Sequence, residues 1–287
     1  MARAGIRRAK SRPVNAADRR HAILAGVAEE QTIRVGELAR DLGCSEMTIR
    51  RDIRRLERDG FIRQTYGGAT AHITRSFDVS FNARALLAAR EKRLIGMRAA
   101  SLIADARVLF VGIGSTTEQF ARYLPGRSDL TVVTPSLPIA SLLGTRPLRV
   151  VVLGGAVLHD ELTCVGPVAV TTLGQYRFDA AVIGAAGLSA RWGVTELTEE
   201  EAAVQRAALK RTERVLVIVD GSKVGAATPI VVGPARQVST LVTDPSAPAA
   251  ELDELRRLGM EVLIAERAAP VRPEPAGHER VPALAGS

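Results

Sequence analysis

Residues 45–58, SEMTIRRDIRRLER, place five arginines in one short segment. On a helical wheel at about 100° per residue, Ile49, Ile53 and Leu56 fall within one sector of roughly 60°. The arginines cover the opposite side; they are Arg50, Arg51, Arg54, Arg55 and Arg58. The pattern predicts a helix that packs on a small core and presents a cationic face. That face is either a surface for an acidic partner or a solvated one, and the neighbouring segments favour the first interpretation.

Two helices are predicted upstream. Residues 17–31 form the first, with Ile23, Leu24 and Val27 as its apolar stripe. Residues 35–42 form the second, with apolar side chains at i, i+3, i+4 and i+7. Gly43 can end that helix in the left-handed conformation, and Ser45 can cap the arginine helix. Two short helices joined by such a turn are a helix-turn-helix, whose second helix enters the major groove of DNA.

A β-hairpin is predicted downstream. Gly60 ends the arginine helix, and two strand-like pieces surround Gly67-Gly68 within residues 61–70. This hairpin completes a winged helix-turn-helix domain over residues 16–70. Met47, Thr48, Arg50 and Arg51 are expected at base edges, because they lie in the N-terminal half of the helix. Arg54, Arg55 and Arg58 are expected on phosphates, with Ser45 at the cap and Arg63 and Tyr66 of the wing as further DNA-binding candidates. Asp52 either orients an arginine or is an exposed acid.

Charge and composition support this division. Residues 1–75 hold 16 Lys and Arg against 9 Asp and Glu, whereas residues 76–287 hold 23 against 22. Such asymmetry is typical of one domain that meets a polyanion attached to one that does not. Residues 1–15 are expected to be a disordered basic arm, either a solubilising tail or a minor-groove finger. No apolar run is long enough for a bilayer, and no signal-peptide pattern follows the basic start, so a cytoplasmic protein without membrane contact is expected.

The rest of the chain predicts an α/β domain. Residues 71–90 are interpreted as a linker and the start of a connecting helix, residues 91–265 as the domain, and residues 266–287 as a disordered tail. Strand-like runs of Val, Leu and Ile alternate with helical segments, which favours a parallel sheet covered on both faces. The runs lie at 108–111, 130–136, 148–155, 178–187, 214–222 and 238–244. The helical segments include 82–106, 198–212 and 248–258.

A glycine-rich turn follows the first of these strands. Gly112 and Gly114 let the chain turn sharply, and Ser115, Thr116 and Thr117 open the next helix. Free N–H groups and hydroxyls at a helix start can bind an anion, although an ordinary capped turn has the same pattern. Ligands of parallel sheets bind beyond the carboxyl ends of the strands. The other candidates for such a site are therefore Ser136, Gly154, Gly155 and Lys223, the last being either a ligand contact or an exposed loop lysine. Glu196, Glu200 and Glu201 either face the pocket or form a solvated acidic helix start, and the second interpretation is favoured because acids at a helix start suit the helix dipole.

Both halves resemble one protein family. Residues 38–69, LARDLGCSEMTIRRDIRRLERDGFIRQTYGGA, resemble the N-terminal domain of DeoR-type bacterial transcription regulators. The stretches GIGSTT, TVVTPS, LGG, GAAG, EEEAAVQR and DGSK resemble motifs of the family's effector domain. The resemblance implies a winged helix-turn-helix followed by a three-layer α/β/α effector domain like ribose-5-phosphate isomerase and CoA transferases, with a mostly parallel sheet. It also implies a repressor of a carbohydrate or polyol operon with a phosphorylated sugar-like effector.

The sequence departs from the family pattern at four positions. Gly112, Pro135, Ala186 and Gln205 stand where the family has Asp, Asn, Asp and Lys. Fewer charged and amide groups are therefore expected to face the ligand, and the ligand class itself is open. A homodimer or homotetramer is expected, because symmetric operators match symmetric proteins.

Two other functions use the same residues. One is a sugar-phosphate isomerase with an appended DNA-binding module, which needs a carboxylate base beside its substrate. Residues 183–187 lack such a carboxylate, and Asp179 and Asp220 do not form a pair there, so no catalytic residue is expected. The other is a protein that binds any DNA, in which the second domain has no purpose. Cys44 and Cys164 are far apart and the histidines are scattered, so neither a metal site nor a cofactor is expected.

Overall fold

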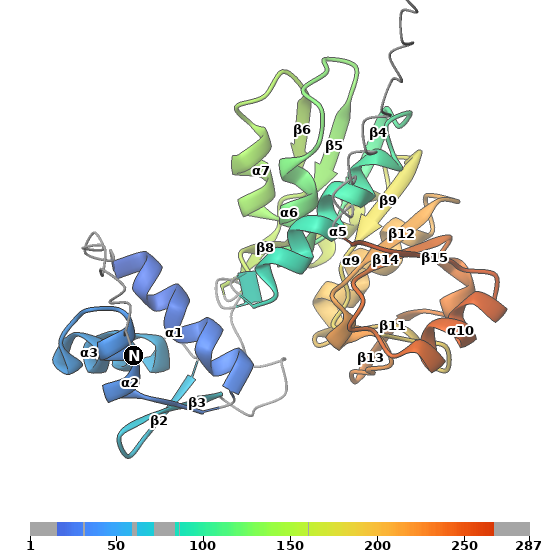
Figure 1. Cartoon of the computed structure of the whole chain (residues 1–287). Coiled ribbons are helices and arrows are strands. Elements are labelled where there is room, and N and C mark those ends of the chain that lie inside the picture. Colours follow the sequence, from blue (N-terminus) through green and yellow to red (C-terminus); the bar gives the residue numbers. More distant parts are fainter. Residues whose placement is uncertain are drawn as a thin grey trace, which may run out of the picture.

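The computed structural model describes residues 16–30, 32–58, 62–71, 84–85, 87–159 and 161–266. The predicted arm, most of the predicted linker and nearly all of the predicted tail lie outside the described residues. Two folded units contain the described helices and strands (Figure 1).

The first unit is a winged helix-turn-helix. Its elements are α1 (Ala16–Glu30), β1 (Thr32–Arg34), α2 (Val35–Asp41), α3 (Glu46–Arg58), β2 (Ile62–Thr65) and β3 (Gly68–Ala71). The three strands form an antiparallel sheet in the order β1-β3-β2. The apolar stripes of the helices meet in one core, which includes Ile23, Val27, Ile49, Ile53, Leu56 and Ile62. The three helices and the hairpin expected here are confirmed, whereas β1 is an addition that becomes a strand only by pairing with β3.

The helix-turn-helix turn has the predicted chemistry. Gly43 has a φ of +62°, the left-handed conformation that glycine adopts without a steric cost. The backbone N–H of Thr48 donates to Oγ of Ser45 at 3.2 Å, which caps the start of α3. The turn therefore orients α3 through local bonds that the sequence encodes.

Of the two roles expected of Asp52, the pairing with an arginine is confirmed and the exposed acid is wrong. Its side chain is buried on the apolar side of α3 and accepts a hydrogen bond from Nε of Arg19 in α1 at 2.5 Å. The partner belongs to another helix, which a helical wheel of α3 cannot show. Asp52 therefore joins α1 to α3 and takes no part in the cationic face.

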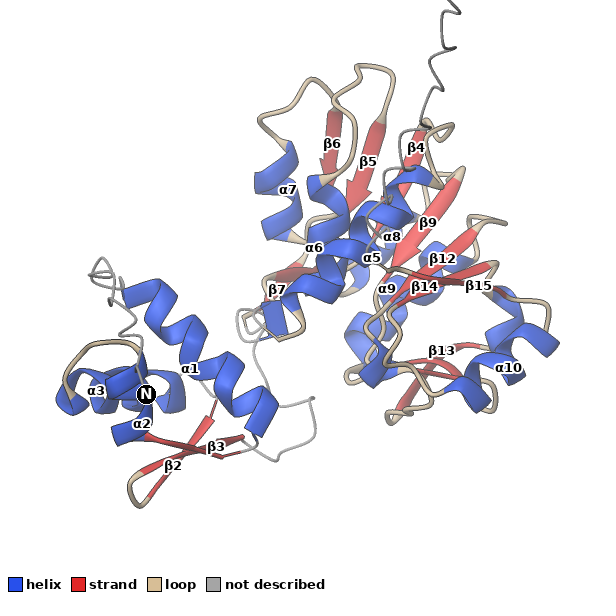
Figure 2. Cartoon of the chain, in the orientation of Figure 1, coloured by secondary structure: helices blue, strands red, loops and turns tan. Residues whose placement is uncertain are grey.

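The second unit is built on a seven-stranded parallel sheet in the order β15-β14-β12-β9-β4-β5-β6 (Figure 2). The strands are β4 (Val108–Val111), β5 (Thr131–Thr134), β6 (Arg149–Val152), β9 (Ala180–Ile183), β12 (Val215–Ile218), β14 (Thr240–Thr243) and β15 (Glu261–Ile264). In the middle of the sheet, Leu109 of β4 is opposite Val132 of β5 and Ala180 of β9. The predicted parallel sheet is confirmed, and β15 is a strand that was not predicted.

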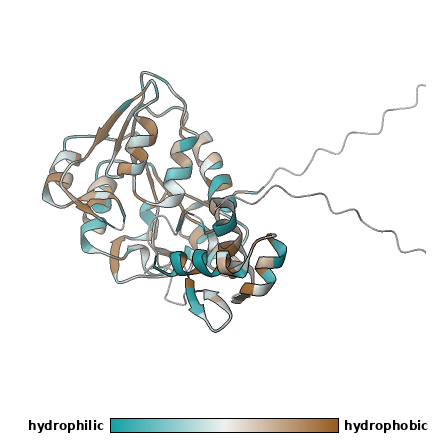
Figure 3. Cartoon of the chain, turned by 90° about the vertical axis from the view of Figure 1, so that its left-hand side faces the viewer, coloured by the Kyte–Doolittle hydropathy of each residue, from teal (hydrophilic) through white to brown (hydrophobic). Residues whose placement is uncertain are grey.

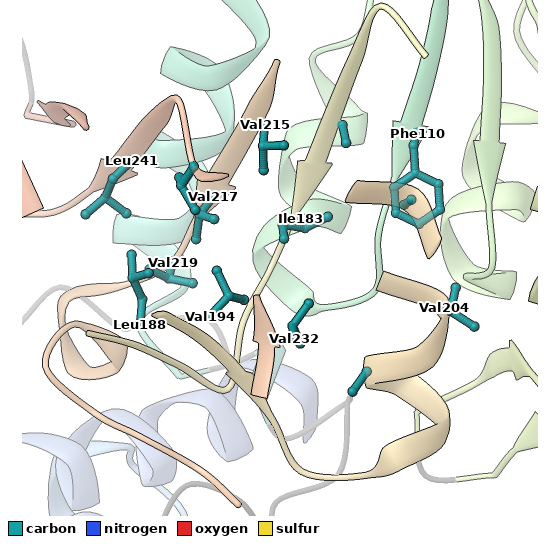
Figure 4. Close-up of a cluster of buried hydrophobic side chains, with 14 of the residues drawn as sticks. Phe110, Ile183, Leu188, Val194, Val204, Val215, Val217, Val219, Val232 and Leu241 are labelled. Carbon is teal, nitrogen blue, oxygen red and sulfur yellow. The ribbon is translucent and has the colours of Figure 1, made fainter. Parts of the chain in front are cut away.

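Helices cover both faces of this sheet, as alternate side chains of one strand show. Leu109 and Val111 pack in a cluster with α5 (Ala89–Ser101), α6 (Ser115–Arg122) and α7 (Leu137–Leu143). Phe110 points to the opposite cluster, which includes residues of α8 (Pro167–Leu173), α9 (Glu199–Leu209) and α10 (Ala249–Arg257) (Figure 4). In Figure 3 the strands are mostly brown, the colour of apolar residues. The three-layer architecture follows from apolar strands buried on both faces.

Smaller elements pack on the side of the sheet to which Phe110 points. A hairpin joins β7 (Ala156–Leu158) to β8 (Thr163–Val165), and a further sheet contains β10 (Gly187–Ser189), β11 (Gly193–Glu196) and β13 (Ile230–Gly233). Two short 3-10 turns, η1 (Gly221–Lys223) and η2 (Ala235–Gln237), complete the unit. The helix expected over 82–106 is shorter, because Ala88 has a φ of +48° and α5 begins only at Ala89.

Candidate functional site

The arginine face of α3 is open to solvent. Arg51, Arg54, Arg55 and Arg58 are exposed, and the Arg50 side chain is 41% exposed beside Glu46, with 3.4 Å between their charged groups. Ile49, Ile53 and Leu56 are buried on the other side. A face of this kind, on the second helix of a helix-turn-helix, can enter a DNA groove without rearrangement of the core.

The other DNA-binding candidates surround this face. Met47 is 70% exposed near the start of α3, and Thr48 is half-buried with its hydroxyl 2.9 Å from that of Ser45. Arg63 is exposed on β2, and Tyr66 is fully exposed at the tip of the wing. Ser45 is engaged as the cap of α3, so its hydroxyl orients the helix. The structure thus brings the helix and wing candidates to the surface of one small domain.

A pocket lies at the carboxyl ends of the central strands of the seven-stranded parallel sheet. Ile113 and Gly114 follow β4, Gly184 to Ala186 follow β9, and Val219 and Asp220 follow β12. These three strands are neighbours, so the segments that follow them converge. This is the place where parallel sheets bind ligands.

The start of α6 forms one wall of the pocket. Gly114 has a φ of +126° and ends its loop directly before Ser115, the first residue of the helix. Ser115 and Thr116 line the pocket, and the first N–H groups of a helix have no acceptor within it. N–H groups of this kind and the helix dipole can stabilise an anion.

Three cationic side chains line the same pocket: Arg84, Lys92 and Lys223. Lys92 is buried, and its Nζ lies 3.8 Å from Oδ2 of Asp220. Burial lowers the pKa of Lys92 to about 8, although the charge of Asp220 opposes this shift. Burial also lowers the pKa of Lys223, which is therefore not the exposed loop lysine of the alternative interpretation. The sequence did not predict Lys92 and Arg84 as pocket residues, because neither belongs to a loop that follows a strand.

Four carboxylate side chains line the same pocket, and two of them pair with its cations: Glu161 with Arg84 and Asp220 with Lys92; the other two are Glu196 and Glu201. Burial raises the pKa of Glu196 to about 8, and the nearby charge of Glu201 adds to the shift. Burial is also the main cause that raises the pKa of Glu201. The expectation of a solvated helix start is wrong for Glu196 and Glu201, because Glu196 ends the buried strand β11 and Glu201 lies on the buried side of α9; Glu200 is exposed as expected.

Several sequence candidates lie outside this pocket. Oγ of Ser136 accepts the backbone N–H of Ile139 and caps α7, and the Thr117 hydroxyl donates to the carbonyl of Gly114 at 2.7 Å. Gly154 and Gly155 lie exposed between β6 and β7. Gly155 is needed for packing, because a Cβ there would lie 2.4 Å from the carbonyl oxygen of Val165. These residues shape the fold around the site and do not line it.

Three of the four departures from the family pattern share one small cavity. Gly112, Pro135 and Gln205 line this cavity of about 10 Å³, while Ala186 lines the main pocket. Nε2 of Gln205 donates to Oε1 of Glu196 at 2.6 Å. Seven charged side chains, supplied by other elements, line the main pocket. That fewer charged and amide groups face the ligand than in the family pattern stays a prediction.

Asp179 has no part in this site. Its carboxylate accepts the backbone N–H groups of Arg107 and Val108 at 2.8 and 2.9 Å, before the start of β4. It therefore lies at the opposite end of the sheet from the pocket. Among the described residues, no group of three or more His, Cys, Asp or Glu side chains is placed to hold a metal ion.

Comparison with known proteins identifies both units. The model of the DeoR C-terminal sensor domain matches residues 87–245, and that of the DeoR-like helix-turn-helix domain matches residues 19–75. The chain belongs to the DeoR family. An uncharacterized HTH-type transcriptional regulator of Escherichia coli K12, YgbI, is 30% identical over 87% of this chain and 98% of its own length. The transcriptional repressor CsqR of the same organism is 30% identical over 84% of this chain and 93% of its own length.

Solved structures are similar at a lower level. Ribose 5-phosphate isomerase A of Methanocaldococcus jannaschii is 19% identical, with a TM-score of 0.36, over 47% of this chain and 54% of its own. Membership of the DeoR family makes the chain a transcriptional regulator and not an enzyme. None of the helices that the structure describes is both long and apolar enough to cross a membrane.

Proposed function

We propose that this DeoR family regulator represses a carbohydrate or polyol operon and is controlled by a phosphorylated sugar-like effector. The winged domain binds the operator through α3, and the effector occupies the pocket beside α6. The observation that carries the DNA half of the proposal is the open arginine face of α3 on a buried apolar stripe.

The pocket supports an effector with two unlike ends. Gly114, Ser115 and Thr116 offer N–H groups and hydroxyls, and Lys92 and Lys223 add positive charge, which suits a phosphate. The buried carboxyl groups of Glu196 and Glu201 offer acceptor oxygens and, where protonated, a donor, which suits the hydroxyl groups of a sugar or polyol. A pocket lined by both kinds of group suits a ligand that carries a phosphate and hydroxyl groups.

Substitutions on α3 test the DNA contacts. We expect Arg50→Ala or Arg51→Ala to cost about 1–3 kcal/mol and to relax sequence preference, because these arginines are assigned to base edges. Arg54→Ala or Arg58→Ala, in contrast, is expected to weaken binding equally for all sequences. Each is also expected to reduce the slope of log K against log salt concentration by about 1 for each protein copy bound. Binding is measured on duplexes that the full-length chain selects from random sequence, at several salt concentrations.

The outcomes distinguish a sequence-specific regulator from a protein that binds any DNA. Equal preference for the selected and scrambled duplexes in the unmodified protein favours a protein that binds any DNA. Unchanged affinity and preference in all four variants contradicts the assignment of α3 to DNA.

The effector site is tested at Thr116. We expect Thr116→Val to reduce phosphate affinity about tenfold, because it removes a buried hydroxyl donor at the start of α6 while keeping the shape of the side chain. Thermal shifts with ribose 5-phosphate, glycerol 3-phosphate and inorganic phosphate measure the change. Thr172→Val, a half-buried threonine on α8 away from the pocket, is the matched control. Equal shifts in the two variants would remove α6 from the site.

A further inference from the structure

Arg84 comes from neither domain as the family models delimit them. The helix-turn-helix model ends at residue 75 and the sensor model begins at residue 87. Arg84 nevertheless lines the sensor pocket. A residue of the segment that connects the two domains is thus part of the pocket wall.

Hydrogen bonds to Glu161 and Lys92 hold Arg84 in that wall. Its guanidinium donates to both carboxylate oxygens of Glu161, with 2.6 Å between Nη1 and Oε1, and both side chains are about 85% buried. Its backbone carbonyl accepts Nζ of Lys92 at 2.5 Å. Glu161 precedes β8 and Lys92 lies on α5, and both line the same pocket. The position of the connecting segment at Arg84 therefore depends on two groups that face the ligand.

We propose that Arg84 binds the anionic group of the effector and transmits its presence to the connecting segment. An anion in the pocket is attracted to the guanidinium and repelled by the Glu161 carboxylate, so it competes with Glu161 for Arg84. It also attracts Lys92, the group that holds the Arg84 carbonyl. Arg84 therefore has two arrangements, paired with Glu161 or paired with the effector. This inference rests on the proposed effector site.

The mechanism requires that the protein bind its operator with a different affinity in each of the two arrangements of Arg84. A ligand shifts an equilibrium only by its differential affinity for the two states. If the effector changes operator affinity by a certain factor, the operator must change effector affinity by the same factor. Arg84 is the described residue that is both in the pocket wall and on the path between the domains.

Two substitutions with opposite expected effects test the role. Arg84→Lys keeps the charge but loses the two parallel bonds, so we expect effector affinity to fall about tenfold and the effect of the effector on DNA binding to disappear. Glu161→Gln removes the competing charge, so we expect effector affinity to rise severalfold. The operator affinity of this variant without effector should equal that of the unmodified protein saturated with effector. Arg90→Ala, at an exposed position on α5, is the matched control and should change neither quantity.

The measurements use the full-length chain. Calorimetry with ribose 5-phosphate, glycerol 3-phosphate and inorganic phosphate gives effector affinity with and without a selected duplex, and circular dichroism confirms that each variant is folded. An Arg84→Lys protein with unchanged coupling, or a Glu161→Gln protein with weaker phosphate binding, overturns the inference while leaving the proposed function in place. If the unmodified protein responds to no phosphorylated probe, both fail. Should Arg84→Lys not fold, the sign of the Glu161→Gln effect still decides.

Discussion

Glu196 illustrates how burial changes the chemistry of a single residue. Its carboxyl group is only 5% exposed at the end of β11 and accepts a hydrogen bond from Gln205 of α9. Burial and the charges of Glu201 and Glu161 raise its pKa to about 8, whereas Gln205 and the charge of Arg84 act in the opposite direction. The carboxyl group is therefore largely protonated near neutral pH and can donate a hydrogen bond to a ligand.

The raised pKa predicts a pH dependence of stability. The unfolded chain ionises at its ordinary pKa near 4.5, whereas the folded protein keeps the proton up to about 8. The contribution of Glu196 to stability is therefore full below about 4.5 and is lost as the pH rises toward 8. Glu196→Gln keeps the acceptor for Gln205 but cannot ionise. We expect its free energy of unfolding, relative to the unmodified protein, to increase by roughly a few kcal/mol between pH 5 and pH 8.

Urea unfolding of both proteins at a series of pH values measures this difference. Glu200→Gln, at an exposed position on α9, is the control and should show a constant difference. A constant difference for Glu196→Gln as well would mean that the folded protein does not hold this proton.

At the scale of the element, the close approach of α5 to α6 determines the position of α6. A Cβ on Gly96 of α5 would lie 2.6 Å from the backbone nitrogen of Phe120 in α6. Contacts this short with backbone atoms cannot be relieved by rotating a side chain. Gly96 therefore allows the two helices to touch, and the start of α6 is held in place through this contact.

Gly96→Ala is accordingly expected to destabilise the protein. Alanine favours a helix by about 1 kcal/mol over glycine, but overpacking against α6 costs typically 1–3 kcal/mol or more. We expect a net loss of roughly 1–2 kcal/mol in urea unfolding and a weaker thermal shift with phosphate probes. Met97→Ala, at the exposed neighbouring position, should stay within about 0.5 kcal/mol. A Gly96→Ala protein as stable as the Met97→Ala protein would show that α5 and α6 do not touch here.

At the scale of the whole molecule, charge and chemistry are divided between two units. The excess of Lys and Arg lies in the first 75 residues, and the buried charged pocket lies in the sensor domain. An effector should therefore stabilise one unit and alter the placement of the other without stabilising it.

Hydrogen exchange can detect this division. A ligand present at about 100 times its dissociation constant adds about 2.7 kcal/mol to the free energy of every local unfolding reaction that disrupts its site. With a binding phosphate probe we expect slower exchange in peptides of β4, α6, β9 and α9, and unchanged exchange in peptides of α1 and α2. Mass spectrometry of the full-length chain measures both. Equal slowing in the two units would place a ligand contact on the winged domain.

The sequence by itself determined most of the elements and the arginine face of α3. The stripe of Ile49, Ile53 and Leu56, the glycine after α2 and the cap at Ser45 are local patterns, so neighbouring residues are enough to predict α3 and its open side. The same holds for the strand, turn and helix around Gly114. Resemblance to a known family added the arrangement of layers, which local patterns favour but do not specify.

Only the tertiary structure decided which charges share the pocket. Arg84, Lys92, Glu161 and Glu196 come from four separate segments, and none of them stands in a motif that marks a ligand site. Asp52 likewise pairs with Arg19, which lies on another helix. The physical reason is that burial and pairing depend on groups brought together across the chain, whereas periodicity reports only on residues within a few turns of one another.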